Sequence, residues 1–315
     1  MIEQFRQDVN AGLSAESKSL PSQYFYDATG DELFQKIMSM PEYYVTRAED
    51  DIFKNKTRQL IDALNLSKDT FFEVVELGAG DGEKSKKLLK KLMDEEYDFV
   101  YHPVDISENI LYHLESTLKE EIPDLVTHPK QSLYFDALAS LKESPHKKVV
   151  LFLGSNIGNL DDKMAADFLY QMGANFRHDD ILVLGVDLKK SRDIVLPAYN
   201  DENGITARFN LNLLERINRE LGGDFVLDNF DHCPEYHEDE GIAFSYLVSL
   251  TEQNVYIESL NKRFKFAEGE KIHTEISRKY DDKTLNKIIA HTDFIIDGKI
   301  TDSNNYFADF ILKRN

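Results

Sequence analysis

Hydrophobic positions change their spacing twice along the chain, and these changes divide it into segments. Residues 1–58 carry apolar side chains at helical spacing, interrupted by Pro21 and Pro41. From Phe71 onward, short apolar runs alternate with stretches of helical spacing, which predicts βαβ units and a parallel sheet. The predicted strands are 71–77, 99–104, 148–153 and 181–186, with a weaker one at 131–135. The helices between them are predicted over 83–92, 107–118 and 165–172.

The alternation stops after Asp187 and returns near the C-terminus. A helix is predicted over 208–221, ended by Gly222-Gly223, and is followed by short strands at 243–251, 254–257, 263–266 and 273–276. A last helix at 283–290 precedes strands at 294–296 and 306–312, with a turn at 297–299. This pattern predicts an α/β core interrupted by an insertion of about 189–279, against which the N-terminal segment packs.

The composition excludes several partner classes. The chain has 57 acidic and 37 basic residues among 315, so its formal net charge of −20 argues against duplex DNA or an anionic membrane as the main partner. The single cysteine, Cys233, excludes an intrachain disulfide and fits a reducing compartment. No apolar run approaches the ~20 residues of a membrane span, and the N-terminus has no signal-peptide pattern. We expect a soluble cytoplasmic enzyme or small-molecule binder.

A glycine-rich loop is the strongest chemical signal. Residues 74–82 read Val-Val-Glu-Leu-Gly-Ala-Gly-Asp-Gly, at the end of a predicted strand and the start of a helix. Dinucleotide folds prefer G-x-G-x-x-G, whereas the third glycine here comes one position earlier and Glu76 precedes the loop. The pattern resembles the first motif of class I S-adenosylmethionine-dependent methyltransferases. A tight turn without ligand and a dinucleotide site are the alternatives. Asp105, after the next strand, suits the ribose hydroxyls of either cofactor.

Other polar positions are ambiguous when taken singly. The loop 154–160 follows a strand and faces the ligand edge of an open sheet, although Asn159 there is equally typical of a helix cap. Glu275 and Ser277 share one face of a strand, which fits either a ring N–H site or a solvated edge. Tyr199, after Pro197, fits either a site or ordinary packing.

A zinc cluster is not expected. His232, Cys233 and His237 have no second cysteine and no known ligand spacing, so a solvated loop is predicted there and no metal is expected.

A series of motifs occurs in order at 21–27, 30–34, 41–47, 76–84, 154–160, 199–201 with 209–210, and 274–277. Together they resemble the histidine-specific Nα-methyltransferases of ergothioneine biosynthesis, from about Lys18 to the C-terminus. The resemblance implies a Rossmann-like class I methyltransferase domain (53–188 and 280–315) and a second, substrate-binding domain (1–52 and 189–279). It also implies three methyl transfers from S-adenosylmethionine to the α-amino group of L-histidine, which give hercynine.

The resemblance also implies roles for individual residues. The positions matched to cofactor contacts are Gly78, Lys84, Asp105, Tyr134 and Phe135, and those matched to substrate contacts are Tyr43, Asn159, Tyr199, Glu275 and Ser277. Tyr26 and Asn159 are expected next to the reacting amine.

Two positions depart from the family pattern. Tyr134-Phe135 replaces an Asp-Phe pair at the adenine, so Asp136 or a backbone carbonyl is the expected acceptor. Ser245 stands where a larger apolar residue is expected to line the substrate pocket. A methyltransferase for another amino acid or amine is therefore one alternative, and a non-catalytic S-adenosylmethionine or amino-acid binding module is the other. We expect a monomer whose only partners are small molecules.

Overall fold

A computed structural model describes residues 2–314 and shows two compact units. The first unit combines the chain up to Tyr44 with Lys190–Arg278, and the second combines Val45–Lys189 with the chain from Lys279 onward. Each unit has an apolar core of its own. The N-terminal segment thus folds with the insertion, and the N-terminal part of this unit ends at Tyr44, whereas the resemblance implied a boundary after residue 52.

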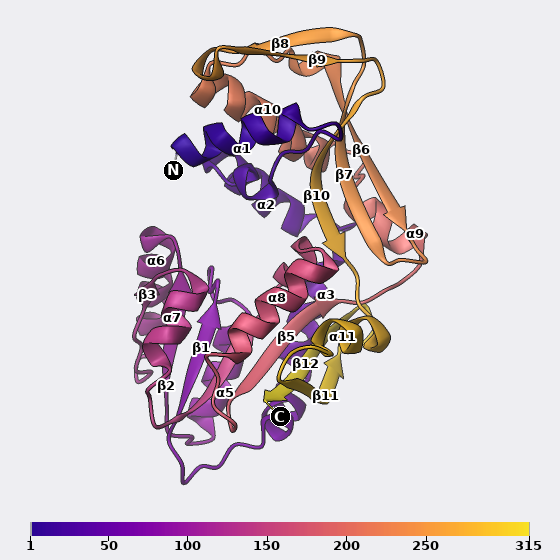
Figure 1. The fold of residues 1–315 in the computed structure, drawn as a ribbon. Coiled ribbons are helices and arrows are strands. Elements are labelled where there is room, and N and C mark those ends of the chain that lie inside the picture. The colour runs from indigo at the N-terminus through magenta and orange to yellow at the C-terminus, as the bar shows by residue number, and fades with distance from the viewer. Residues whose placement is uncertain (1, 315) are drawn as a thin grey trace. The chain divides into compact units, whose positions relative to one another are not determined.

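The second unit is built on a seven-stranded sheet with strand order β11-β12-β5-β4-β1-β2-β3 (Figure 1). Its parallel strands are β1 (Phe72–Leu77), β2 (Phe99–Asp105), β3 (Lys130–Gln131), β4 (Lys147–Phe152) and β5 (Ile181–Asp187). β12 (Phe307–Arg314) runs antiparallel between β5 and β11 (Phe294–Thr301). The chain order reverses between β1 and β4, and in open α/β sheets ligands bind beyond the carboxyl ends of the strands at such a point.

Helices cover this sheet, and side chains cap the first turns of some of them. They are α3 (Tyr44–Asn55), α4 (Thr57–Leu64), α5 (Ser85–Asp94), α6 (Glu108–Glu121), α7 (Tyr134–Leu141), α8 (Asp162–Gly173) and α11 (Asp282–Ile289). Ser107, Asp161 and Asp281 each accept a backbone N–H at the start of a helix, which fixes where α6, α8 and α11 begin. Strands β1, β2 and β5 are buried along their whole length, as expected for strands covered on both faces. No helix within residues 2–314 is both long and apolar enough to cross a bilayer.

Two predicted elements of this unit are wrong. The strand at 131–135 ends at Gln131, and Tyr134 already begins α7, because Ala137, Leu138 and Leu141 form a helical stripe that packs into the core. The turn at 297–299 is absent, since β11 continues through a bulge beside Gly298. The chain reverses after Thr301 instead, where the Asp302 carboxylate accepts the N–H of Phe307 at 2.8 Å.

The first unit packs helices against a small antiparallel sheet of order β10-β7-β6 (Figure 1). Its helices are α1 (Ile2–Ser14), α2 (Ala28–Ser39), α9 (Arg192–Val195) and α10 (Ile205–Leu221), and its strands are β6 (Phe230–His237), β7 (Ile242–Ser249), β8 (Gln253–Ile257), β9 (Lys262–Phe266) and β10 (Lys271–Arg278). Single 3-10 turns lie at Ser22–Phe25, Leu196–Ala198, Leu227–Asn229 and Glu258–Leu260. Along β7 every second residue is buried, so one face of the sheet belongs to the core.

The predicted solvated loop around His232 is also wrong, because residues 230–237 form β6. His232 is buried, whereas His237, on the alternate face, is exposed. Neighbouring residues of a strand point to opposite faces, so His232 and Cys233 do not converge on one point. Across residues 2–314 the structure shows no group of three His, Cys, Asp or Glu side chains that could hold a metal ion.

Candidate active site

The glycine loop links β1 to α5 with three residues in the left-handed region. Gly78, Gly80 and Gly82 have φ of 71°, 55° and 67°, a conformation that favours glycine. A Cβ at Gly78 would lie 2.9 Å from the Tyr134 hydroxyl, whereas one at Gly80 would meet nothing within 4 Å. The loop is therefore closed beside Tyr134 and open beside Gly80, which leaves its backbone accessible to a ligand.

Asp105 joins the carboxyl ends of β1 and β2. Its carboxylate accepts the N–H of Gly80 at 3.3 Å and that of Ser107 at 2.9 Å. The predicted cofactor residues Gly78 and Asp105 are thus brought to one edge of the sheet. A carboxylate at this edge has spare lone pairs for the hydroxyls of a sugar.

Tyr134 and Phe135, at the start of α7, have different surroundings. Burial and the nearby Asp105 carboxylate raise the pKa of Tyr134, and its hydroxyl lies next to Gly78. Phe135 instead packs on Phe168, with ring centroids 5.2 Å apart, at the margin of the core. The structure therefore places Tyr134 beside the glycine loop and Phe135 among apolar side chains.

Glu76 lies inside the sheet rather than at its open edge. It accepts a hydrogen bond from the Tyr101 hydroxyl, and burial raises its pKa to about 7 in spite of that bond and of the nearby Lys84 ammonium. Glu76, which precedes the glycines, thus supports the loop from inside the sheet.

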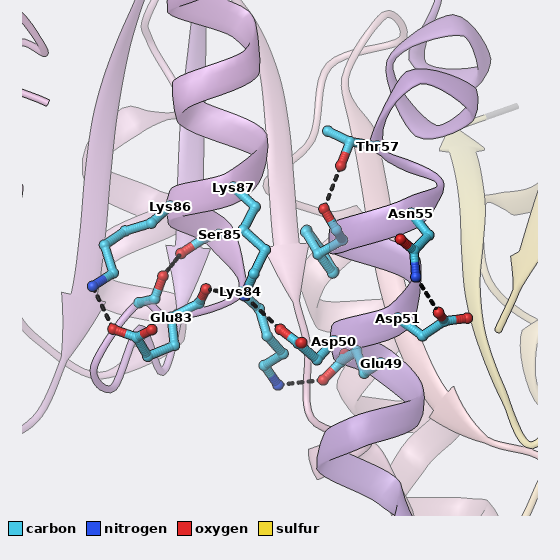
Figure 2. A network of polar contacts seen from close by, with 12 residues as sticks. Glu49, Asp50, Asp51, Asn55, Thr57, Glu83, Lys84, Ser85, Lys86 and Lys87 are labelled. Carbon is cyan, nitrogen blue, oxygen red and sulfur yellow. Dashed lines mark hydrogen bonds and ion pairs between the residues drawn. The ribbon is translucent and has the colours of Figure 1, made fainter. Parts of the chain in front are cut away.

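Lys84, which precedes α5, is paired with a carboxylate that no sequence motif indicates. Its ammonium donates to Glu49 of α3, and Figure 2 shows this ion pair beside the parallel pair Lys87–Asp50. Glu49 also accepts the N–H of Gly154, with the nitrogen 2.8 Å from Oε1. No motif predicted this contact, because α3 and α5 are separated by the whole of β1.

The loop after β4 is held in an unusual conformation. Gly154 and Ser155 both have positive φ, 76° and 59°, which is uncommon for serine. The Asn156 side chain lies beside Gly154, 3.7 Å from the position of a Cβ there. Asn159 ends the single 3-10 turn Asn156–Asn159 and is exposed. The loop thus lies at the same edge of the sheet as the glycine loop, with its asparagine side chains available to a ligand.

In the first unit, Glu275 and Ser277 lie on the core-side face of β10. Glu275 is paired with Ser245 of β7, and Ser277 with Ala243, which is buried. Directly paired residues point to the same face of a sheet, so the predicted common face of Glu275 and Ser277 is the side covered by α10. Ser245 belongs to this face as well.

A β-bulge at Thr274 aims these side chains. Ile272 pairs with buried Leu247, and the register shifts between His273 and Glu275, so that Thr274 is an extra residue on β10. The Thr274 hydroxyl lies 2.8 Å from Asn210 Oδ1 of α10 and 3.0 Å from the carbonyl oxygen of Ser245. These contacts fix the bulge and bring Glu275 to the same face as Ile272.

Hydrogen bonding links Tyr199 to the same face. The Tyr199 hydroxyl donates to Ser277 Oγ at 2.8 Å. Burial, followed by the charge of Glu275, raises the pKa of Tyr26 far above that of a free tyrosine, although its ring is partly exposed. Tyr26, Tyr199, Glu275 and Ser277 are therefore near neighbours in this unit.

An aromatic cluster extends this group to Tyr43. The Tyr26 ring meets Phe209 and Phe34 edge-on at 5.8 and 5.6 Å, and Phe34 meets Tyr43 at 6.4 Å. The predicted substrate residues are thus brought together within the first unit, with the exception of Asn159, which lies in the second.

Comparison with known families decides the identity. Residues 5–314 match the family described as "Histidine-specific methyltransferase, SAM-dependent". The chain belongs to this family.

The chain is 38% identical over 280 residues to the histidine N-alpha-methyltransferase of Mycolicibacterium smegmatis. The alignment covers 88% of this chain and 85% of that one. The chain is 28% identical to ergothioneine biosynthesis protein 1 of Schizosaccharomyces pombe, covering 94% of this chain and 39% of that longer one. Among solved structures, the magnesium protoporphyrin IX methyltransferase of Synechocystis PCC 6803 with bound SAM aligns with a TM-score of 0.47 at 12% identity, over 93% and 95% of the two chains. Family membership confirms the expected Rossmann-like class I methyltransferase fold. It also confirms the expectation that the protein is an S-adenosylmethionine-dependent N-methyltransferase.

Proposed function

We propose that this enzyme transfers three methyl groups from S-adenosylmethionine to the α-amino group of L-histidine and forms hercynine, the first step of ergothioneine biosynthesis. The observation that carries the proposal is that Ser277, which accepts the Tyr199 hydroxyl proton, shares one face of β10 with Glu275. A neutral imidazole has one N–H donor and one nitrogen acceptor.

Glu275 and Ser277 are complementary to that ring. An ionised carboxylate only accepts, so Glu275 suits the ring N–H. We assign Ser277, which accepts the Tyr199 proton, the role of donor to the second ring nitrogen. An amino acid whose ring lacks either group would leave one of these partners without a hydrogen bond, and that loss supports selectivity for histidine.

The second unit supplies the residues that would hold the cofactor. S-adenosylmethionine carries the methyl group on an electrophilic sulfonium carbon. The open backbone beside Gly80, the Asp105 carboxylate and the Lys84 ammonium fit an adenosine sugar and an amino-acid carboxylate. Tyr134 adds an aromatic wall next to Gly78.

Tyr26 and the rings around it suit a growing cation. Because its pKa is raised, Tyr26 stays a neutral phenol at physiological pH and does not act as a phenolate base. We assign Tyr26 two roles: it orients the substrate amine, and it passes the protons of that amine on to water. Aromatic faces near a methylated ammonium contribute about 0.5–2 kcal/mol by cation–π attraction. Asn159 is proposed to hold the substrate carboxylate and amino end, and Tyr43 to border the imidazole.

One experiment tests substrate and reaction together. Purified enzyme is incubated with S-adenosylmethionine and an equimolar pool of the standard amino acids, and products are identified by mass spectrometry. The expected result is a gain of three methyl groups on histidine alone. Binding of S-adenosylhomocysteine without any methylation would favour the non-catalytic module instead.

A second candidate substrate class is a different amino acid with a polar side chain. Ser245 favours it, because its buried hydroxyl has no hydrogen-bond partner and lies on the face of Glu275. Methylation of another member of the pool in preference to histidine would support this class. We place either activity in the cytoplasm, in a monomeric enzyme.

A further inference from the structure

We infer that Glu49 is a positioning residue for the cofactor, which acts by holding the Lys84 ammonium and the loop after β4 in place. The inference rests on the proposed binding of S-adenosylmethionine in the second unit. It adds a residue of α3 that lies outside the glycine motif and outside every predicted contact.

Glu49 ties three segments together at one edge of the sheet. It is completely buried, and its carboxylate contacts Lys84, just before α5, and the N–H of Gly154, just after β4. The Lys84 ammonium is 3.8 Å from the position that a Cβ of Gly154 would take. The Lys84 ammonium, which is proposed to bind the carboxylate of the cofactor, therefore lies between the loop after β4 and Glu49.

The sheet leaves room for this carboxylate. A Cβ at Gly185 of β5 would lie 2.4 Å from Glu49 Oε1 and 3.2 Å from Asp309 Oδ1, so only glycine fits at this position without displacing them. Asp309 is the register partner of Gly185 on β12. Two acidic side chains thus enter the space that a larger residue at position 185 would fill.

The charges around Lys84 are unequal. Burial and the neighbouring Glu49 raise the pKa of Asp309 well above its usual range, and neither of its oxygens has a hydrogen-bond partner. Burial alone would lower the pKa of Lys84, but Glu49, and after it Glu76 and Asp309, raise it above its usual value. Glu49 is the carboxylate in direct contact, and it keeps the ammonium charged.

Adjacent acids on α3 provide a matched control. Asp50 pairs with Lys87 at 2.5 Å, in a more exposed ion pair between the same two helices (Figure 2). Asp51 accepts the N–H and O–H of Ser303, each at 2.7 Å. Asp50→Asn therefore loosens the α3–α5 contact without touching Lys84 or Gly154.

The test compares Glu49→Gln with Asp50→Asn by calorimetric titration of S-adenosylhomocysteine, which needs no turnover. We expect about 10- to 100-fold weaker binding for Glu49→Gln, since a charge-assisted contact is lost, and less than about twofold for Asp50→Asn. Between pH 7 and 9 the affinity of wild type should stay constant, whereas that of Glu49→Gln should fall as Lys84 loses its proton. A purely structural role would not produce this pH dependence.

Two further measurements place the effect on Lys84 and on the loop. In a Lys84→Met background, Glu49→Gln should cause little additional loss of affinity. Without any ligand, hydrogen exchange in residues 154–159 should rise in Glu49→Gln and stay unchanged in Asp50→Asn. If Glu49→Gln does not fold, Gly185→Ala displaces the same carboxylate and should weaken binding in the same way.

The outcomes are distinct. The inference, but not the proposed function, is overturned if Glu49→Gln binds S-adenosylhomocysteine with wild-type affinity. The same holds if Asp50→Asn loses as much affinity as Glu49→Gln, or if Glu49→Gln causes its full loss of affinity in the Lys84→Met background as well. A wild-type enzyme that binds no S-adenosylhomocysteine overturns the proposed function and this inference with it.

Discussion

Ser245 lies directly opposite Glu275 in the β7–β10 pair, and its hydroxyl is buried without a hydrogen-bond partner. A buried hydroxyl without a partner costs free energy in the folded protein, so the structure offers this group to a ligand on the face of Glu275.

Replacing Ser245 by alanine should therefore separate stability from activity. We expect an unchanged or slightly higher free energy of unfolding, and kcat/KM about 2- to 10-fold lower for whichever amino acid of the pool the enzyme methylates. Ser249→Ala on the same strand is the control, because Ser249 Oγ is 2.9 Å from the carbonyl oxygen of Thr251 and should contribute to stability only. Unchanged kinetics in Ser245→Ala would remove Ser245 from the site.

Glu275→Gln should reduce use of histidine far more than cofactor binding. The amide keeps the size of the side chain but loses the negative charge that strengthens the hydrogen bond from the ring N–H. We therefore expect kcat/KM for histidine to fall by about 10- to 100-fold. The dissociation constant of S-adenosylhomocysteine should not change, because Gly78, Lys84 and Asp105 belong to the other unit. A wild-type rate with histidine would contradict the role of Glu275.

Thr274→Val should change the orientation of the Glu275 side chain, although Thr274 itself is not expected to contact the substrate. Valine has nearly the same shape, but it leaves Asn210 Oδ1 without its buried hydrogen bond, at a cost of about 1–3 kcal/mol. We expect a lower midpoint in urea unfolding together with a higher KM for histidine. Thr251→Val, at an exposed position after β7, should change neither value.

Asp105→Asn should weaken S-adenosylhomocysteine binding by at least about tenfold, because a neutral amide accepts hydroxyl protons less strongly than a carboxylate. Calorimetry measures the loss directly. Asp98→Asn, at an exposed position just before the same strand, is the matched control. Equal affinities in the two variants would refute the ribose contact.

Acid should destabilise both units through buried histidines. Burial lowers the pKa of His102 and of His232 to about 4, below the usual value of 6.5, so the unfolded state binds more protons between these pH values. Stability is thus full above pH 6.5 and falls by about 1.4 kcal/mol per histidine for each pH unit toward 4. Urea unfolding at several pH values should show a smaller slope in His102→Gln and in His232→Gln. The slope should not change in His291→Gln, at an exposed position.

Local patterns predicted the parts of the fold that depend on contiguous residues. The four main parallel strands and the glycine loop follow from apolar runs that end in glycines. The strand at 230–237 was missed because it carries charged residues and Pro234, and these are tolerated there because β6 is an edge strand.

Contacts between distant segments could not be predicted in this way. The pairing of Ser245 with Glu275 depends on register across two strands, and the pairing of Lys84 with Glu49 depends on how α3 packs on the sheet. Gly185 was a possible signal for the second contact, since a glycine within a buried strand indicates that another group approaches closely.

The bulge at Thr274 makes recognition depend on the backbone path of β10 as well as on its composition. If the same residues formed a regular ladder without the bulge, Ile272 and Glu275, three positions apart, would lie on opposite faces, and either Ile272 would leave the core or Glu275 and Ser277 would turn away from α10. A change that closes the bulge would therefore abolish imidazole binding while every recognition residue is still encoded.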